Sequence, residues 1–163
     1  FGIGGDRTEN ILWRIQQGEL DNVTPKVVVL MIGTNNSFAN TPAQIAAATG
    51  KIVDQIKTKR PGTRVLLVSM TPRGARTNSQ GQQDDGVRTG TTVRETNKLT
   101  QKLADGDRVR WLDLTPVFTD ADGKPSAALL YDQLHPNTEG YAAWDKAMWP
   151  VLDEMLKAAP LTK

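Results

Sequence analysis

The only histidine of this 163-residue chain, His135, stands three residues after Asp132 and directly before a proline. At this spacing the carboxylate can accept a hydrogen bond from one imidazole nitrogen. That bond fixes the tautomer and leaves the other nitrogen free to act as a general base. A solvated loop histidine beside a capping aspartate has the same sequence, so the pair alone is a weak signal. It indicates proton transfer only if other polar groups meet it.

Two other positions could supply hydrogen-bond donors to a reacting group. Asn35 follows the apolar run 27–32, and Gly5 ends a glycine-rich segment that precedes a helical pattern. Each also has an ordinary interpretation, because asparagines in turns and glycines before helices often serve only the backbone. Combined with a base at His135, however, a side-chain amide and a backbone N–H are the parts that stabilise a tetrahedral oxyanion in acyl transfer.

Alternating strands and helices must position these groups. The runs 27–32 and 65–70 are continuous and apolar, which predicts strands buried on both faces, and 109–112 predicts a shorter strand. After each strand, apolar residues repeat at the spacing of a helix, which indicates parallel βα units and an α/β fold. Helices are predicted over 8–17, from 42 up to Pro61, over 92–103, and over 138–158, the last kinked or restarted at Pro150.

In open α/β sheets, ligands bind at the carboxyl ends of the strands. Asn35 lies just beyond such an end, and the stiff strand before it can aim its amide. Residues 1–6 are expected to be the end of a strand that runs into the glycine-rich loop. The polar stretch 71–90 has no clear period and is predicted to be a long loop, either functional or a tolerated insertion.

Composition excludes several classes of protein. The chain has no cysteine, which rules out disulfides, cysteine-ligated zinc and a cysteine nucleophile. Its net charge is only +2 and its basic residues are scattered, so no nucleic-acid partner is predicted. No apolar segment approaches the roughly 20 residues of a membrane span. The segment 120–123 resembles a calcium loop but lacks the bidentate glutamate, and it is predicted to be a turn; no metal or cofactor is expected.

Taken together, these segments resemble the SGNH or GDSL esterases and lipases, most closely the catalytic subunits of platelet-activating-factor acetylhydrolase and their bacterial relatives. The similarity runs nearly from end to end as ordered blocks. They are residues 1–6, 12–14 and 18–20, then 33–36, 72–74, 94–97, 132–136 and 140–141.

The resemblance implies a three-layer αβα sandwich with a central parallel sheet, the flavodoxin-like SGNH fold, over 1–163 as a single domain. It also implies roles for four residues. The Gly5 N–H and Asn35 Nδ2 would stabilise the oxyanion, His135 would be the base, and Asp132 would orient it. The activity would be hydrolysis of short-chain acyl esters, with an acetylated carbohydrate or lipid as a candidate substrate.

One block of the family is missing. Its Gly-Asp-Ser, which follows the first strand and supplies the nucleophile, does not occur here, and Gly5-Asp6-Arg7 matches only two of its letters. The serines present are Ser37, Ser69, Ser79 and Ser126, and Ser37 is the nearest to Asn35, but it lies outside the family pattern. We therefore expect the domain to be truncated at its N-terminus, with the first strand and the nucleophile on roughly 30 or more residues before Phe1.

Three functional hypotheses follow. The first is a serine ester hydrolase whose nucleophile lies before Phe1. The second is a non-catalytic relative that keeps the cleft as a binding module. The third is a protein that binds phosphate or a nucleotide at Gly2–Gly5, before a helix. The sequence disfavours this hypothesis, because Arg7 occupies the place of the last glycine in the motif Gly-x-Gly-x-x-Gly. The sequence makes no prediction of oligomeric state or compartment.

Overall fold

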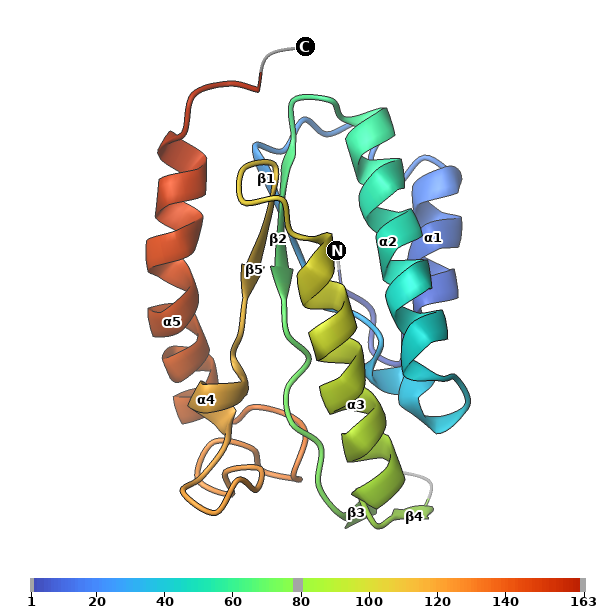
Figure 1. Ribbon diagram of the computed structural model, residues 1–163, viewed down its shortest axis with the longest axis vertical. Coiled ribbons are helices and arrows are strands. Elements are labelled where there is room, and N and C mark those ends of the chain that lie inside the picture. The colour runs from blue at the N-terminus through green and yellow to red at the C-terminus, as the bar shows by residue number, and fades with distance from the viewer. Residues whose placement is uncertain (1, 78–80, 162–163) are drawn as a thin grey trace.

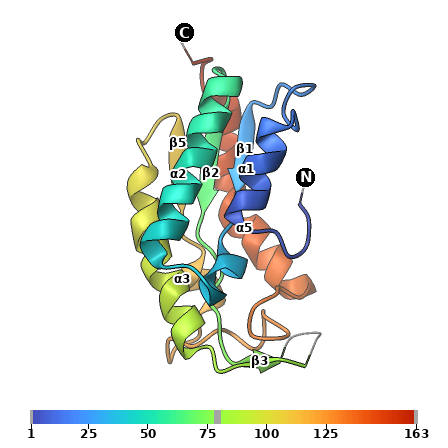
Figure 2. The ribbon, with the colours of Figure 1, turned by 90° about the vertical axis from the view of Figure 1, so that its right-hand side faces the viewer.

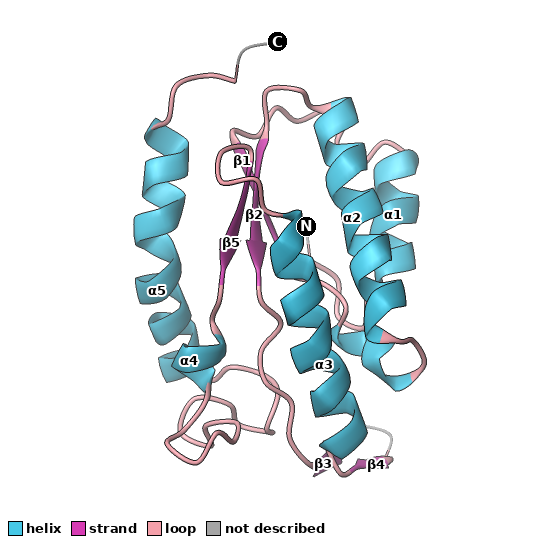
Figure 3. Cartoon of the chain, in the orientation of Figure 1, coloured by secondary structure: helices cyan, strands magenta, loops and turns pink. Residues whose placement is uncertain are grey.

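The computed structural model describes residues 2–77 and 81–161, which are built around a three-stranded parallel sheet (Figures 1 and 3). Its strands are β1 (Val27–Leu30), β2 (Arg64–Val68) and β5 (Val109–Leu112), in the order β1-β2-β5. In the middle strand, Val65 lies opposite Val28 on one side and Val109 on the other. Because the strands are parallel, the segments that follow them meet at one edge, at the bottom of Figure 1.

Helices cover both faces of the sheet, which confirms the three-layer α/β architecture. Figure 1 shows the sheet between α5 (Thr138–Lys157) on its left and α1 (Thr8–Gln16) and α2 (Pro42–Lys59) on its right. Figure 2 shows α1 and α2 side by side on their face. The remaining α-helices are α3 (Val87–Thr100), which packs on α2, and the short α4 (Thr115–Phe118), which contacts α5.

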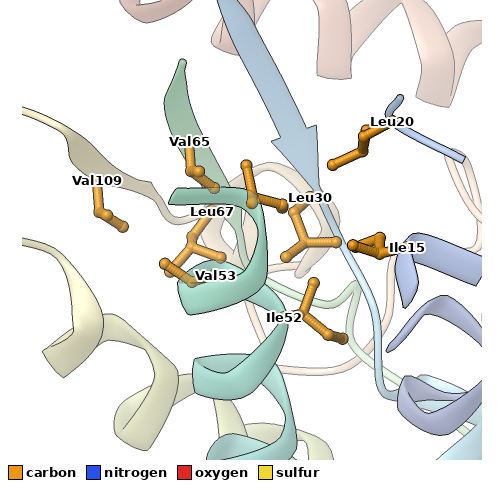
Figure 4. Close-up of a cluster of buried hydrophobic side chains, with 9 residues drawn as sticks. Ile15, Leu20, Leu30, Ile52, Val53, Val65, Leu67 and Val109 are labelled. Atoms are coloured by element: carbon orange, nitrogen blue, oxygen red, sulfur yellow. The ribbon is translucent and has the colours of Figure 1, made fainter. Parts of the chain in front are cut away.

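Each layer contact has its own apolar core. On the α1 and α2 face, Ile15 and Ile52 pack with Leu30 and Leu67 of the sheet (Figure 4). On the opposite face, Phe118 and other side chains of α4 and α5 cover the alternate residues of β2. The middle strand is buried along its whole length, as the sequence predicts for a strand covered on both sides.

Most predicted helix ends are confirmed by local capping. The hydroxyl of Thr41 accepts from the Gln44 N–H at the start of α2, and Gly18 adopts a left-handed conformation just after α1. Helix α3 begins five residues before the predicted start, because Asp84 and Asp85 accept the N–H groups of Gly86 and Val87. Helix α5 runs through Pro150 without restarting, so of the two predicted alternatives, a kink or a restart, the restart is wrong.

Two expectations for the first strands are wrong. The apolar run 27–32 predicts a strand buried on both faces, but β1 is an edge strand of the described sheet and Val29 is 40% exposed. A groove of about 570 Å³ lies along it, lined mainly by apolar residues such as Ile11, Leu20 and Val29. Residues 2–6 form no strand, and Phe1 lies outside the described residues.

The predicted loop 71–90 contains a small hairpin. Strands β3 (Arg76–Thr77) and β4 (Gln83–Asp84) pair antiparallel, and α3 begins shortly after them. Residues 78–80, which include Ser79, lie outside the described residues. The predicted turn at 120–123 is confirmed, since the Gly123 N–H donates to the Asp120 carbonyl.

Candidate active site

A cavity of about 210 Å³ lies at the carboxyl edge of the sheet. Its wall includes Gly5, Asn35 and His135, three residues from loops that are far apart in the sequence. Apolar side chains, among them Ile3 and Met70, complete the wall. The structure thus brings a glycine backbone, a side-chain amide and an imidazole to one small space.

Two hydrogen bonds join His135 to Asp132. The imidazole Nδ1 lies 2.8 Å from Asp132 Oδ2, and the backbone N–H of His135 donates to Asp132 Oδ1 at 2.8 Å. An ionised carboxylate can only accept, so Nδ1 carries the proton and Nε2 keeps its lone pair. The imidazole is about half exposed and stacks on the ring of Tyr131, with 5.9 Å between the ring centroids. This arrangement leaves Nε2 free to accept a proton.

Asp132 is held ionised by three donors. Partial burial would raise its pKa, but the backbone N–H and imidazole of His135 and the guanidinium of Arg76 outweigh this effect and lower the pKa to about 2. Arg76 Nη2 lies 2.6 Å from Asp132 Oδ2. The carboxylate therefore keeps its charge, and its hold on the imidazole, across the whole neutral range.

A left-handed glycine positions the amide of Asn35. Gly33 follows β1 at a φ of 117°, and a Cβ at this position would lie 2.6 Å from Ile45 Cγ2. The chain then enters the 3-10 helix η1 (Thr34–Phe38), in which Asn35 Nδ2 donates to the Asp6 carbonyl at 2.9 Å. One N–H of the amide is used in this way, and an amide has two, so the second remains for a ligand.

The neighbouring Asn36 ties this turn to the start of α1. Its side chain is 2% exposed, accepts from the Thr8 N–H, and donates to Glu9 and Asn40. Gly5 lies just before α1 at a φ of 86°, within the tight turn that the Asp6 N–H closes on the Ile3 carbonyl. Gly5 and Asn35 are therefore fixed relative to one another.

Two of the described serines have structural partners. Ser37 is fully buried, and its hydroxyl donates to the Thr34 carbonyl at 2.7 Å. Ser69 is also fully buried and accepts from the Leu114 N–H at 2.8 Å. Neither serine, nor Ser126, is among the described residues that line the cavity with His135.

The described residues lack two further features, a metal site and a membrane-spanning helix. Within residues 2–77 and 81–161, no group of three or more His, Asp or Glu side chains is arranged to hold a metal ion. None of the helices in the described part of the chain is both long and apolar enough to cross a membrane.

Sequence reasoning missed Arg76 as part of the site. It lies 56 positions before Asp132, within a polar stretch that has no period, and nothing in its neighbours distinguishes it from other surface arginines. Only the fold brings the two residues together.

Comparisons with known proteins agree with this architecture. Residues 1–143 match the model of the GDSL-like lipase/acylhydrolase family. The chain is 35% identical over 167 residues to platelet-activating factor acetylhydrolase IB subunit alpha2 of Rattus norvegicus, covering 100% of this chain and 67% of the relative. It thus spans about two thirds of that relative's length.

Solved structures share the fold. A GDSL-like lipase from Bacteroides thetaiotaomicron superposes with a TM-score of 0.79 at 16% identity, over 94% of this chain and 74% of the other. Est24, a carbohydrate acetylesterase from Sinorhizobium meliloti, gives a TM-score of 0.68 at 21% identity, over 88% and 67%. At these identities the likeness shows a common fold.

Proposed function

The chain belongs to the GDSL-like lipase/acylhydrolase family, and on this premise we propose that it hydrolyses short-chain acyl esters. His135 is the general base and Asp132 holds its tautomer. The observation that carries the proposal is the single cavity walled by Gly5, Asn35 and His135. A base and two kinds of N–H donor around one small space are what acyl transfer requires.

In the reaction, a serine hydroxyl attacks the ester carbonyl while His135 Nε2 takes its proton. The carbonyl oxygen becomes an oxyanion, which the Gly5 N–H and the free N–H of Asn35 stabilise. The imidazolium then gives the proton to the leaving alcohol, and an acyl-enzyme remains. Water, deprotonated by the same imidazole, attacks the acyl-enzyme and releases the carboxylic acid and the serine.

We place the nucleophilic serine on an additional strand that pairs with the free edge of β1. Three observations support this placement. Val29 is exposed, an apolar groove of about 570 Å³ runs along the strand, and β1 ends at the cavity. A parallel strand in that groove would cover the apolar surface and deliver its carboxyl end beside His135. The partners of Ser37 and Ser69 argue against a role for these two serines.

An acetyl ester is the proposed substrate class. The cavity is small, and the 35% identical relative is named an acetylhydrolase. The alcohol part is open to a carbohydrate, a lipid or a small aryl group. The acetylesterase that shares the fold makes acetylated carbohydrates the first class to assay.

Covalent labelling tests the proposal against the binding-module alternative. A fluorophosphonate probe should label the complete protein, the form that carries the proposed strand, and the same protein should hydrolyse 4-nitrophenyl acetate. His135→Gln should abolish both signals, because the serine loses its base, whereas Gln101→Ala at an exposed position should change neither. A folded complete protein that neither reacts with the probe nor hydrolyses esters would instead be a binding module.

A further inference from the structure

The hairpin within the predicted loop 71–90 reaches the candidate site through one arginine. We propose that Arg76 is a positioning residue that holds the Asp132 carboxylate, and through it the tautomer of His135, so that strand β3, which carries Arg76, is a working part of the site. This inference rests on the proposed function, which it deepens.

First, the segment that leads into the hairpin holds the catalytic loop residue by residue. The Thr71 hydroxyl donates to the Leu134 carbonyl at 3.2 Å, and the Gly74 N–H donates to the Gln133 carbonyl at 3.0 Å. Arg76 then reaches Asp132 itself at 2.6 Å. The two segments run antiparallel, so successive residues of 71–76 contact successively earlier residues of the loop, 134, 133 and 132. The bond from Arg76 to Asp132 is the last of these three contacts.

Second, the catalytic loop needs such support. Gln133, between Asp132 and His135, has a φ of 63°, and it is the one non-glycine residue with a positive φ in the described part of the chain. A backbone of this kind persists only when its surroundings hold it. The Arg76 and Asp132 side chains are 13% and 21% exposed, so their pair is sheltered from solvent screening. Without Arg76, the imidazole is the one remaining partner of Asp132 Oδ2. The carboxylate can then rotate and move Oδ2 away from the imidazole while Oδ1 keeps its hydrogen bond to the His135 N–H.

Third, the hairpin is itself firmly anchored. The Arg73 side chain is fully buried, donates to Asp84 Oδ2 at 2.9 Å, and lies over the Phe38 ring at 4.3 Å. Asp84 also accepts from the Thr89 hydroxyl and the Gly86 N–H. The hairpin base is therefore tied to α3 and to η1, the element that carries Asn35. An arginine mounted on this base is fixed in space and can position another side chain.

The tautomer of the imidazole provides a readout that does not depend on activity. In a tag-free chain His135 is the only histidine, so nitrogen-15 NMR at alkaline pH shows one imidazole. The wild-type ring should carry its proton on Nδ1. In Arg76→Gln the ring should become a mixture with the Nε2–H form, which is the favoured form of a free imidazole in water. Arg76→Lys keeps one charged donor and should lie between the two.

A matched control separates positioning from general loss of charge. Arg94→Gln makes the same substitution at an exposed position of α3, where the arginine donates to the Thr91 hydroxyl, and it should leave the tautomer unchanged. In the complete protein, Arg76→Gln should lower kcat by about 10-fold or more with little change in KM, because Arg76 orients the base rather than the substrate.

The outcomes are distinct. A folded Arg76→Gln variant with a wild-type tautomer would overturn the inference, and so would a wild-type ring that already samples both tautomers, a result that needs no variant. If the wild-type complete protein hydrolyses no ester, the proposed function fails, while the tautomer comparison still decides whether Arg76 positions the pair.

Discussion

Asn35 Nδ2 donates to the backbone carbonyl of Asp6, the residue directly after Gly5, at 2.9 Å. This one hydrogen bond links the two proposed oxyanion donors, Gly5 and Asn35, because the Asn35 side chain holds the backbone of Asp6, the residue next to Gly5. It also aims the second N–H of the amide, since an amide group is planar. The donor side of the cavity is therefore preorganised before any substrate enters.

Asn35→Ala tests the role of this donor. Loss of one oxyanion donor typically lowers kcat by ~10² to 10³, whereas loss of one partly buried hydrogen bond costs only about 1 kcal/mol of folding free energy. We expect such a fall in the hydrolysis of 4-nitrophenyl acetate by the complete protein, with KM and the melting temperature little changed. Wild-type turnover in a folded Asn35→Ala variant would remove Asn35 from the oxyanion site.

The lowered pKa of Asp132 predicts how the folding stability depends on pH. Its pKa falls from 3.8 to about 2 on folding, so its ionised form stabilises the fold above about pH 4, and this contribution disappears as the pH falls toward 2. Denaturant titrations of the wild type and Asp132→Asn should show a difference in unfolding free energy that shrinks over this range by up to about 2 kcal/mol. A difference that stays constant from pH 5 to pH 2 would contradict the assignment.

Gly86→Ala tests how tightly the hairpin is packed. Gly86 has a φ of 73°, and a Cβ at this position would lie 2.3 Å from the carbonyl carbon of Gly74. Gly123 has a nearly equal φ of 76° but no neighbouring atom within 4 Å, so Gly123→Ala measures the backbone strain alone. We expect Gly86→Ala to be less stable than Gly123→Ala by about 1 to 3 kcal/mol in chemical denaturation.

The same substitution should also affect catalysis. The Gly74 N–H holds the Gln133 carbonyl, so a displaced Gly74 loosens the loop between Asp132 and His135. We expect a lower kcat in Gly86→Ala and an unchanged kcat in Gly123→Ala. Equal stabilities and equal rates for the two variants would show that the contact does not matter.

Ser37→Ala distinguishes a structural serine from a nucleophile. The Ser37 hydroxyl donates to the Thr34 carbonyl and is fully buried, so its removal should cost about 1 kcal/mol of stability. Labelling of the complete protein by the fluorophosphonate probe should persist in this variant. Loss of labelling in a folded Ser37→Ala protein would make Ser37 the nucleophile and remove the need for a serine elsewhere.

The fold class can be predicted from the sequence because the strands are continuous apolar runs with clear boundaries. Four of the five residues of β2 (Arg64–Val68) lie in the run 65–70, and Val109–Leu112 matches β5 residue for residue. The exposure of β1 could not be read in the same way. Val29 has the apolar neighbours of a buried residue, and its exposure depends on which strands lie beside it rather than on its own pattern.

The early start of α3 had a signal that could have been read. Asp84 and Asp85 precede a glycine and cap the first turn, but that turn carries no apolar period, because the residues that it buries are Thr89 and Gly90. Arg76 had no local signal, because its partner lies far away in sequence. For Gly5, Asn35 and His135, the resemblance to the esterase family implied a common site, and one cavity is indeed lined by all three.

The uncovered edge of β1 has a consequence beyond catalysis. In the part of the chain that the structure describes, no strand pairs with the outer side of β1, so its backbone N–H and C=O groups, beside apolar side chains such as Val29, form a template onto which strands from other molecules can add. We therefore expect the 163 residues alone to self-associate along this edge, and a tethered strand in the groove to block that association. The segment that we propose brings the nucleophile would at the same time guard the protein against aggregation.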